Sequence, residues 1–117
     1  MKRSVLSRAE VFSPTRWYSV RCIFKRRDQP QYEERITVWH ARSFEAAIER
    51  AEAEAIEYLK SSDFEYLRLA QAYDLRTDFI EDGTEVFSLI RSSPLGPEEY
   101  IERFFNTGSE AQRNIEL

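Results

Sequence analysis

The stretch that decides the fold is SFEAAIERAEAEAIEYLK, residues 43–60. Its apolar residues recur every three or four positions, which places them on one face of an α-helix, and charged residues cover the other faces. Ser43 is a suitable N-cap because its hydroxyl can accept a hydrogen bond from a free amide of the first turn. The expected apolar face consists of Phe44, Ala47, Ile48, Ala51, Ala55, Tyr58 and Leu59. The sequence therefore predicts one long amphipathic helix, which must pack on a second layer.

Two segments before the helix have the alternating pattern of β-strands. They are RWYSVRCIFK, residues 16–25, and YEERITVWHA, residues 32–41, and the polar RRDQPQ stretch between them predicts a loop. We expect these strands to pair as a hairpin with one face on the helix. That inner face would consist of Val20, Cys22, Ile36 and Val38. The opposite face would gather Trp17, Arg21, Ile23, Arg35 and Trp39.

A second hairpin is expected after the helix. Residues 64–80 and 85–91 are β-type runs, and Asp-Gly between them is typical of a two-residue turn because Gly83 tolerates a positive φ. A tight turn pairs Phe79 with Val86, although a slip of one residue would exchange the faces. The expected core face of this hairpin consists of Leu67, Leu69, Tyr73, Leu75, Phe79, Val86 and Ile90. The stretch from residue 66 also has spacing that suits the start of a helix.

The last expected element is a short helix in PEEYIERFFN, with Pro97 near its first position. Its apolar stripe consists of Tyr100, Ile101, Phe104 and Phe105. The complete order is β-β-α-β-β-α. We therefore expect an α+β domain with a mostly antiparallel sheet of about four strands, one long helix on one face and a short C-terminal helix.

Length and composition fit one soluble domain. The chain has 117 residues and 42% hydrophobic residues, which is ordinary for a globular protein. We expect a flexible N-terminal lead-in at residues 1–15, a single domain at 16–106 and a polar C-terminal tail at 107–117. One cysteine excludes an internal disulfide and fits a reducing compartment. The sequence has no apolar run of membrane-spanning length and no apolar core of a signal peptide. We therefore expect a cytoplasmic protein without membrane attachment.

Few residues could carry chemistry. Cys22 lies in mid-strand on the expected inner face, which favours a buried structural thiol. His40 is the only histidine, and Glu33 and Glu34 lie too far along the same strand to be convincing acid–base partners. One Cys and one His cannot form the usual zinc set, and the three glycines do not cluster into a phosphate loop. We therefore expect no catalytic residue, no metal, no cofactor and no enzymatic activity.

The outer face of the first hairpin is the informative feature. Trp and Arg are enriched at interface hot spots, and an apolar patch of this size is uncommon on a monomer. Three alternatives could cover this face: the C-terminal apolar stripe of the same chain, a second copy of the chain, or a different protein. We predict a non-enzymatic protein-interaction domain, with or without self-association. Its expected partner-binding residues are Trp17, Arg21, Arg35 and Trp39.

Two other functions use different features. Aromatic and arginine side chains on an open sheet can stack the bases of single-stranded nucleic acid, with phosphates at Lys25, Arg26 and Arg27. The net charge of −4 argues against this function, because residues 43–117 hold seven Lys/Arg against seventeen Asp/Glu. That acidic part instead suits an immunity- or antitoxin-like inhibitor, which blocks a basic enzyme by charge complementarity.

Several runs resemble a family of small bacterial proteins labelled domain of unknown function 4288. The runs are WYSVRCIFK, YEERITVWHARSFEAAIERAEAEA, AQAY, EDGTEVFSLIRSS and FFNTGSE, and they span roughly residues 16–112. The resemblance implies a bacterial source and a single compact domain. The family has no assigned activity, substrate or catalytic residues, so the resemblance transfers no site to this chain.

Overall fold

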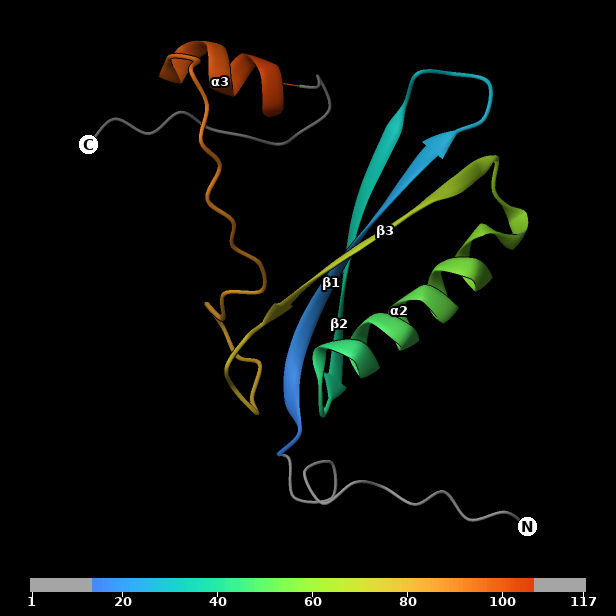
Figure 1. Cartoon of the computed structure of the whole chain (residues 1–117), viewed down its shortest axis with the longest axis vertical. Helices are drawn as coiled ribbons and strands as arrows, with labels where there is room; N and C mark the ends of the chain where they lie inside the picture. The colour runs from blue at the N-terminus through green and yellow to red at the C-terminus, as the bar shows by residue number, and fades with distance from the viewer. Residues whose placement is uncertain (1–13, 107–117) are drawn as a thin grey trace.

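A computed structural model describes residues 14–106, and its secondary structure is an α+β arrangement as expected (Figure 1). The elements in chain order are β1 (Arg16–Arg26), β2 (Tyr32–Ala41), α2 (Phe44–Tyr58), the 3-10 turn η1 (Leu59–Ser61), β3 (Phe64–Asp74) and α3 (Pro97–Phe104). Nearly all of the expected lead-in, and the whole expected tail at 107–117, lie outside the described residues.

The sheet has three antiparallel strands in the order β2-β1-β3, so the strand that comes first in the sequence lies in the middle. Helix α2 crosses one face of this sheet (Figure 1). The cap is confirmed, since the Ser43 hydroxyl accepts a hydrogen bond from the amide of Ala46 at 3.1 Å.

The core lies between β1 and α2. The buried β1 side chains are Tyr18, Val20, Cys22 and Phe24, and the buried α2 side chains are Ala47, Ala51 and Ala55. Small alanine side chains allow the helix axis to approach the sheet closely, so the larger β1 side chains fill the layer between them.

The expected faces of the first hairpin are wrong by one residue. Val20 lies opposite Thr37, and Cys22 lies opposite Arg35. Because opposed residues of neighbouring strands share a face, Arg35 and not Ile36 is on the side of the helix. Ile36 and Val38 lie on the other face, where they are 43% and 40% exposed.

The physical reason is the position of β2 at the edge of the sheet. The inner-face side chains of β2 are only half-buried, so this face needs long amphipathic side chains rather than fully apolar ones. Arg35 and Trp39 meet that need, because their apolar parts cover the core while their polar ends remain outside.

The second hairpin does not form, so the sheet has three strands and not four within residues 14–106. Strand β3 ends at Asp74, and residues 85–91 belong to no strand. The Asp-Gly turn itself is present: Gly83 has φ 87°, and the amide of Thr84 donates to the carbonyl of Glu81 at 3.0 Å. The expected partners Phe79 and Val86 are instead 75% and 41% exposed.

The chain beyond β3 is bent away from a returning strand. The backbone amide of Arg76 donates to a side-chain oxygen of Asp74 at 2.7 Å, and Arg76 has the left-handed φ of 59°. The amide of Leu75 and the carbonyl of Thr77 are already bonded to the backbone of Trp17, each at 3.0 Å. The segment that was expected to extend β3 therefore completes the end of β1 instead.

A bulge in β3 changes which of its residues reach the core. Cys22 lies opposite Ala70 and Phe24 opposite Tyr66, so residues 67–69 face the single residue Ile23. Leu67 and Leu69 were expected in the core but are 42% and 46% exposed. The inner face of β3 is instead formed by Phe64, Tyr66, Ala70 and Ala72.

Candidate partner-binding surface

The outer face of the sheet is the side opposite α2, and it holds two of the four expected binding residues. The indole nitrogen of Trp17 donates to the carbonyl of Asp78 at 3.0 Å, and its ring lies 5.0 Å from the ring of His40. Arg21 donates to the side chain of Gln71 at 2.6 Å and to the Glu34 carboxylate at 3.2 Å. These bonds hold the Arg21 guanidinium flat against the outer face.

The other two expected binding residues lie on the inner face. Arg35 donates to both oxygens of the Glu54 carboxylate and lies 4.0 Å above the ring of Tyr58. The hydrogen bond to Glu54 raises the pKa of Arg35 above its ordinary value. Trp39 donates to the Thr37 hydroxyl at 2.7 Å. Because they face α2, Arg35 and Trp39 do not share a surface with Trp17, and the expected four-residue surface is wrong.

The outer face has an apolar set that sequence reasoning assigned to the core. We name Tyr32, Ile36 and Val38 the β2 stripe, and they are 62%, 43% and 40% exposed. The alternation of β2 does contain this signal, since the three residues occupy every second or fourth position. Because Trp39 lies on the other side of the strand, both faces of β2 contain a large apolar residue. The sequence pattern therefore does not show which face points toward α2.

The chain itself covers the other half of the outer face. The Tyr73 hydroxyl donates to the Glu85 carboxylate at 2.9 Å, and the ring of Phe87 lies 6.0 Å from that of Tyr73. The guanidinium of Arg21 lies 4.8 Å above the Phe87 ring. Ser19, in the middle of this face, is fully buried. The uncovered part of the face is therefore the half that belongs to β2.

A groove of about 290 Å³ separates the β2 half of the outer face from α3. It is lined by Arg21, Glu34, Leu89, Arg91, Tyr100, Phe104 and Phe105. The guanidinium of Arg91 donates to the Tyr100 hydroxyl at 3.0 Å and lies 4.6 Å above the Phe104 ring. One wall of the groove is polar and the other is aromatic, which suits a polypeptide better than a small apolar molecule.

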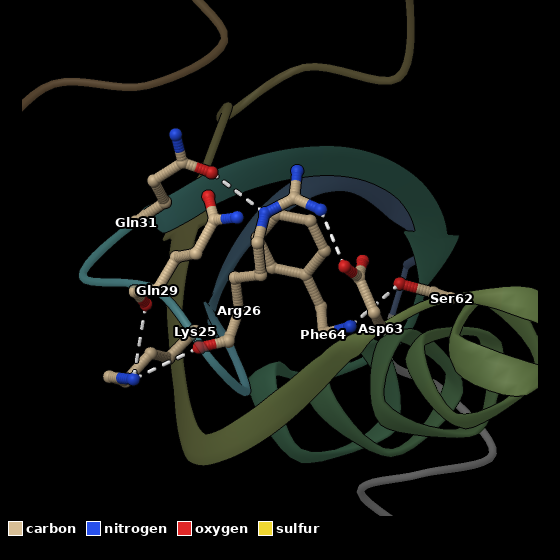
Figure 2. Close-up of polar contacts among 7 residues, drawn as sticks. All are labelled: Lys25, Arg26, Gln29, Gln31, Ser62, Asp63 and Phe64. Atoms are coloured by element: carbon tan, nitrogen blue, oxygen red, sulfur yellow. Dashed lines mark hydrogen bonds and ion pairs between the residues drawn. The ribbon is translucent and has the colours of Figure 1, made fainter.

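The basic loop after β1 is occupied by contacts within the chain (Figure 2). The Lys25 ammonium donates to the carbonyls of Arg26 and Gln29 at 2.9 and 3.2 Å. The Arg26 guanidinium donates to the side chains of Gln31 and Asp63 at 2.7 and 2.6 Å. These cations fasten the β1–β2 loop to the start of β3, so binding a phosphate would require breaking those bonds.

Several of the acidic side chains of α2 are likewise bonded within the chain. Glu52 accepts from the Tyr66 hydroxyl at 2.6 Å, and Glu57 lies 2.9 Å from the Lys60 ammonium. Together with the pairing of Glu54, these contacts use three of the carboxylates in attaching or ordering α2. Two of the three, Glu54 and Glu57, are paired with cations, whereas Glu52 keeps its charge beside a neutral hydroxyl.

The groups that could act as nucleophile or base are placed as follows. Cys22 is 4% exposed on the inner face of β1, which confirms the expected buried thiol. His40 is exposed on the outer face and stacks on Trp17. Within residues 14–106, no three His, Cys, Asp or Glu side chains are grouped so that they could hold a metal ion. In the same range no helix has the length and apolar character needed to cross a bilayer.

We expect stability to fall at alkaline pH. Burial raises the pKa of the Cys22 thiol, and burial followed by the hydrogen bond to Glu52 raises the pKa of the Tyr66 hydroxyl. In the unfolded chain these groups ionise at ordinary values of about 8.5 and 10, while the folded chain resists ionisation. Their contribution is therefore complete below about pH 8 and declines progressively as pH rises above the ordinary pKa values, first that of Cys22 and then that of Tyr66.

Urea unfolding at pH 7.5, 9 and 10.5, followed by circular dichroism, measures this decline. Tyr66→Phe should give a lower starting stability but a flatter pH dependence. Tyr32→Phe, at a tyrosine that is 62% exposed, is the matched control and should decline like the wild type. Equal slopes for all three proteins would contradict the assignment to Tyr66.

Comparisons with known proteins found no matching family model, no matching curated protein and no matching solved structure. The resemblance to domain of unknown function 4288 therefore stays a prediction.

Proposed function

We propose that this chain is a non-enzymatic protein-interaction domain of the bacterial cytoplasm, and that its contact surface is the β2 half of the outer face. The observation that carries the proposal is the β2 stripe. Three large apolar side chains at neighbouring positions on one strand remain 40% or more exposed, although the core of the domain is complete without them. A contiguous apolar patch with polar neighbours is typical of a protein–protein contact.

Trp17 and Arg21 remain candidate contact residues in this proposal, but their neighbours differ from those expected. Both lie on the outer face, beside the β2 stripe rather than beside Arg35 and Trp39. The Arg21 guanidinium is held by Gln71 and Glu34, so it is ordered before a partner arrives. An ordered side chain loses less conformational entropy on binding than a mobile one, which favours affinity. Arg35 and Trp39 would act only indirectly, by holding β2 on α2.

The two other functions have weaker support. Nucleic-acid binding needs available cations, and Lys25 and Arg26 are bonded to groups of their own loop and to Asp63 (Figure 2). An inhibitor with an acidic contact surface needs available carboxylates, and Glu52, Glu54 and Glu57 are used within the chain. The aliphatic members of the β2 stripe, Ile36 and Val38, have no role in either function.

An affinity capture from bacterial lysate tests the proposal. We expect wild-type protein to retain a polypeptide that Ile36→Asp does not retain, because a carboxylate in a buried apolar contact is left without compensation. Ile56→Asp is the matched control, since Ile56 is 62% exposed on α2, away from the outer face. Nuclease treatment separates proteins that are held through nucleic acid.

Each result of the capture has a meaning. Retention by wild type and Ile56→Asp, with loss in Ile36→Asp, supports the outer face as the contact surface. Equal retention by all three proteins would contradict it. Loss of the captured material after nuclease treatment would transfer the function to nucleic-acid binding.

A further inference from the structure

The chain after Asp78 forms an arm, residues 79–106, which contacts the outer face of the sheet through Glu85 and Phe87 but adds no strand to the sheet. Apart from the turn at 81–84, it has no regular structure before α3. In the described part of the chain, α3 does not pack against any strand or against α2 (Figure 1). Long connections without secondary structure are uncommon inside compact domains and are usually functional.

The arm carries apolar side chains that have no cover. We name Ile101, Phe104 and Phe105 the α3 stripe; they are 49%, 42% and 54% exposed and lie three or four positions apart. Ile90, before the helix, is 99% exposed. A helix of eight residues is too short to be stable in water without packing, so α3 needs a surface against which its stripe is buried.

Charge favours the first hairpin as that surface. Residues 14–42, which contain the hairpin, hold seven Lys/Arg against three Asp/Glu, whereas the arm, residues 79–106, holds two against six. The arm is thus acidic by the same margin by which the hairpin is basic. Complementary charges steer two such surfaces together and disfavour contacts between two arms or two hairpins.

The α3 stripe lies across the groove from Arg21 and Glu34 of its own sheet, and its side chains remain 42–54% exposed there. Phe87 holds the early arm against Tyr73 and Arg21, on the β1 and β3 side of the outer face. With the arm in that place, the β2 stripe and the α3 stripe of the same chain both remain exposed. One chain therefore carries two apolar surfaces, the β2 stripe and the α3 stripe, and it buries neither of them completely.

We propose that the partner of the outer face is a second copy of this chain, and that the α3 stripe of each copy packs on the β2 stripe of the other. This inference rests on the proposed function and names its partner. Reciprocal contacts of this kind close a two-fold dimer, in which both stripes of both copies are buried at once.

Sedimentation velocity at about 100 μM protein measures the state of the whole chain. We expect twice the chain mass of 13.9 kDa for the wild type and for the control Ile56→Asp. Ile36→Asp in the β2 stripe and Phe104→Asp in the α3 stripe should each weaken association by about tenfold or more, because each places a charge in a dry contact. Circular dichroism checks folding, and Val38→Lys replaces any β2 variant that does not fold.

Mixing the two weakened variants tests the exchange itself. In a mixed dimer, the intact α3 stripe of Ile36→Asp meets the intact β2 stripe of Phe104→Asp, so one of the two contacts is restored. We expect the mixture to associate at least about threefold more tightly than either variant alone. A contact made within each chain cannot be restored by mixing.

The outcomes separate this inference from the proposed function. A monomeric wild type at about 100 μM overturns the second copy as partner, while the lysate capture still decides whether another protein binds the face. A dimer that neither variant weakens overturns the outer face as the contact. Weakened variants that gain nothing on mixing overturn the reciprocal exchange of α3.

Discussion

Replacement of Phe24 by alanine is expected to lower the free energy of unfolding by about 3–5 kcal/mol. Phe24 is fully buried near the C-terminal end of β1, and its ring lies 5.6 Å from the rings of both Tyr58 and Tyr66. The side chain thus joins the central strand to α2 and to β3, and its removal leaves a cavity among rigid neighbours. A domain with an ordinary stability of about 5–15 kcal/mol would lose a large share of it.

Urea unfolding followed by circular dichroism gives this loss from the shift in midpoint. Phe79→Ala is the matched control, because it removes the same atoms from a side chain that is 75% exposed. We expect the control to change stability by less than about 0.5 kcal/mol. Similar losses at both positions would contradict a core centred on β1.

Ala51→Asp is expected to abolish cooperative folding. Ala51 is 2% exposed at the contact of α2 with the sheet, between the equally buried Ala47 and Ala55. A carboxylate there must either lose its hydration without a partner or push the helix away from β1. Either course costs several kcal/mol, which is comparable with the whole stability of a small domain.

Ala53→Asp provides the control on the same helix. Ala53 lies two residues further on and is exposed, so the substitution has the same helix propensity without the burial. We expect a cooperative thermal melt for Ala53→Asp and a broad or absent transition for Ala51→Asp. A cooperative, wild-type-like melt for Ala51→Asp would contradict the packing of α2 on the sheet.

The elements that local signals define could be predicted from the sequence. The helix predicted at 43–60 occupies Phe44–Tyr58, with Ser43 as its cap, because periodicity and capping depend on neighbouring residues only. The first two strands were predicted within a residue or so of their ends for the same reason. The turn at Gly83 is also a local property, and it is present.

The pairing of strands could not be predicted, because it depends on contacts between residues that are far apart in the sequence. Strand β3 pairs with β1 across the helix connection, and the segment after Gly83 finds no strand position in this chain. The local sequence of β3 contains no signal that identifies β1 as its partner strand. The Asp-Gly signal correctly predicts a reversal of direction but does not say whether the chain before and after it will pair.

The sheet faces on which the candidate residues lie were half predicted for a related reason. Trp17 and Arg21 were assigned to the correct side of β1, since only one face of that strand is apolar throughout. Strand β2 has apolar residues on both faces, Ile36 and Val38 on one and Trp39 on the other. Its orientation depends on the pairing of β2 with β1 and on its packing against α2, which the sequence of β2 does not contain.

The bulge in β3 determines how the sheet meets other chains. Strand β3 lies at an edge of the sheet, where a straight strand would offer a continuous row of amides and carbonyls for further strands. Residues 67–69 interrupt that row, and Arg68, at φ 61°, places an exposed charged residue there. The bulge therefore disfavours the addition of a further strand along this edge of the sheet.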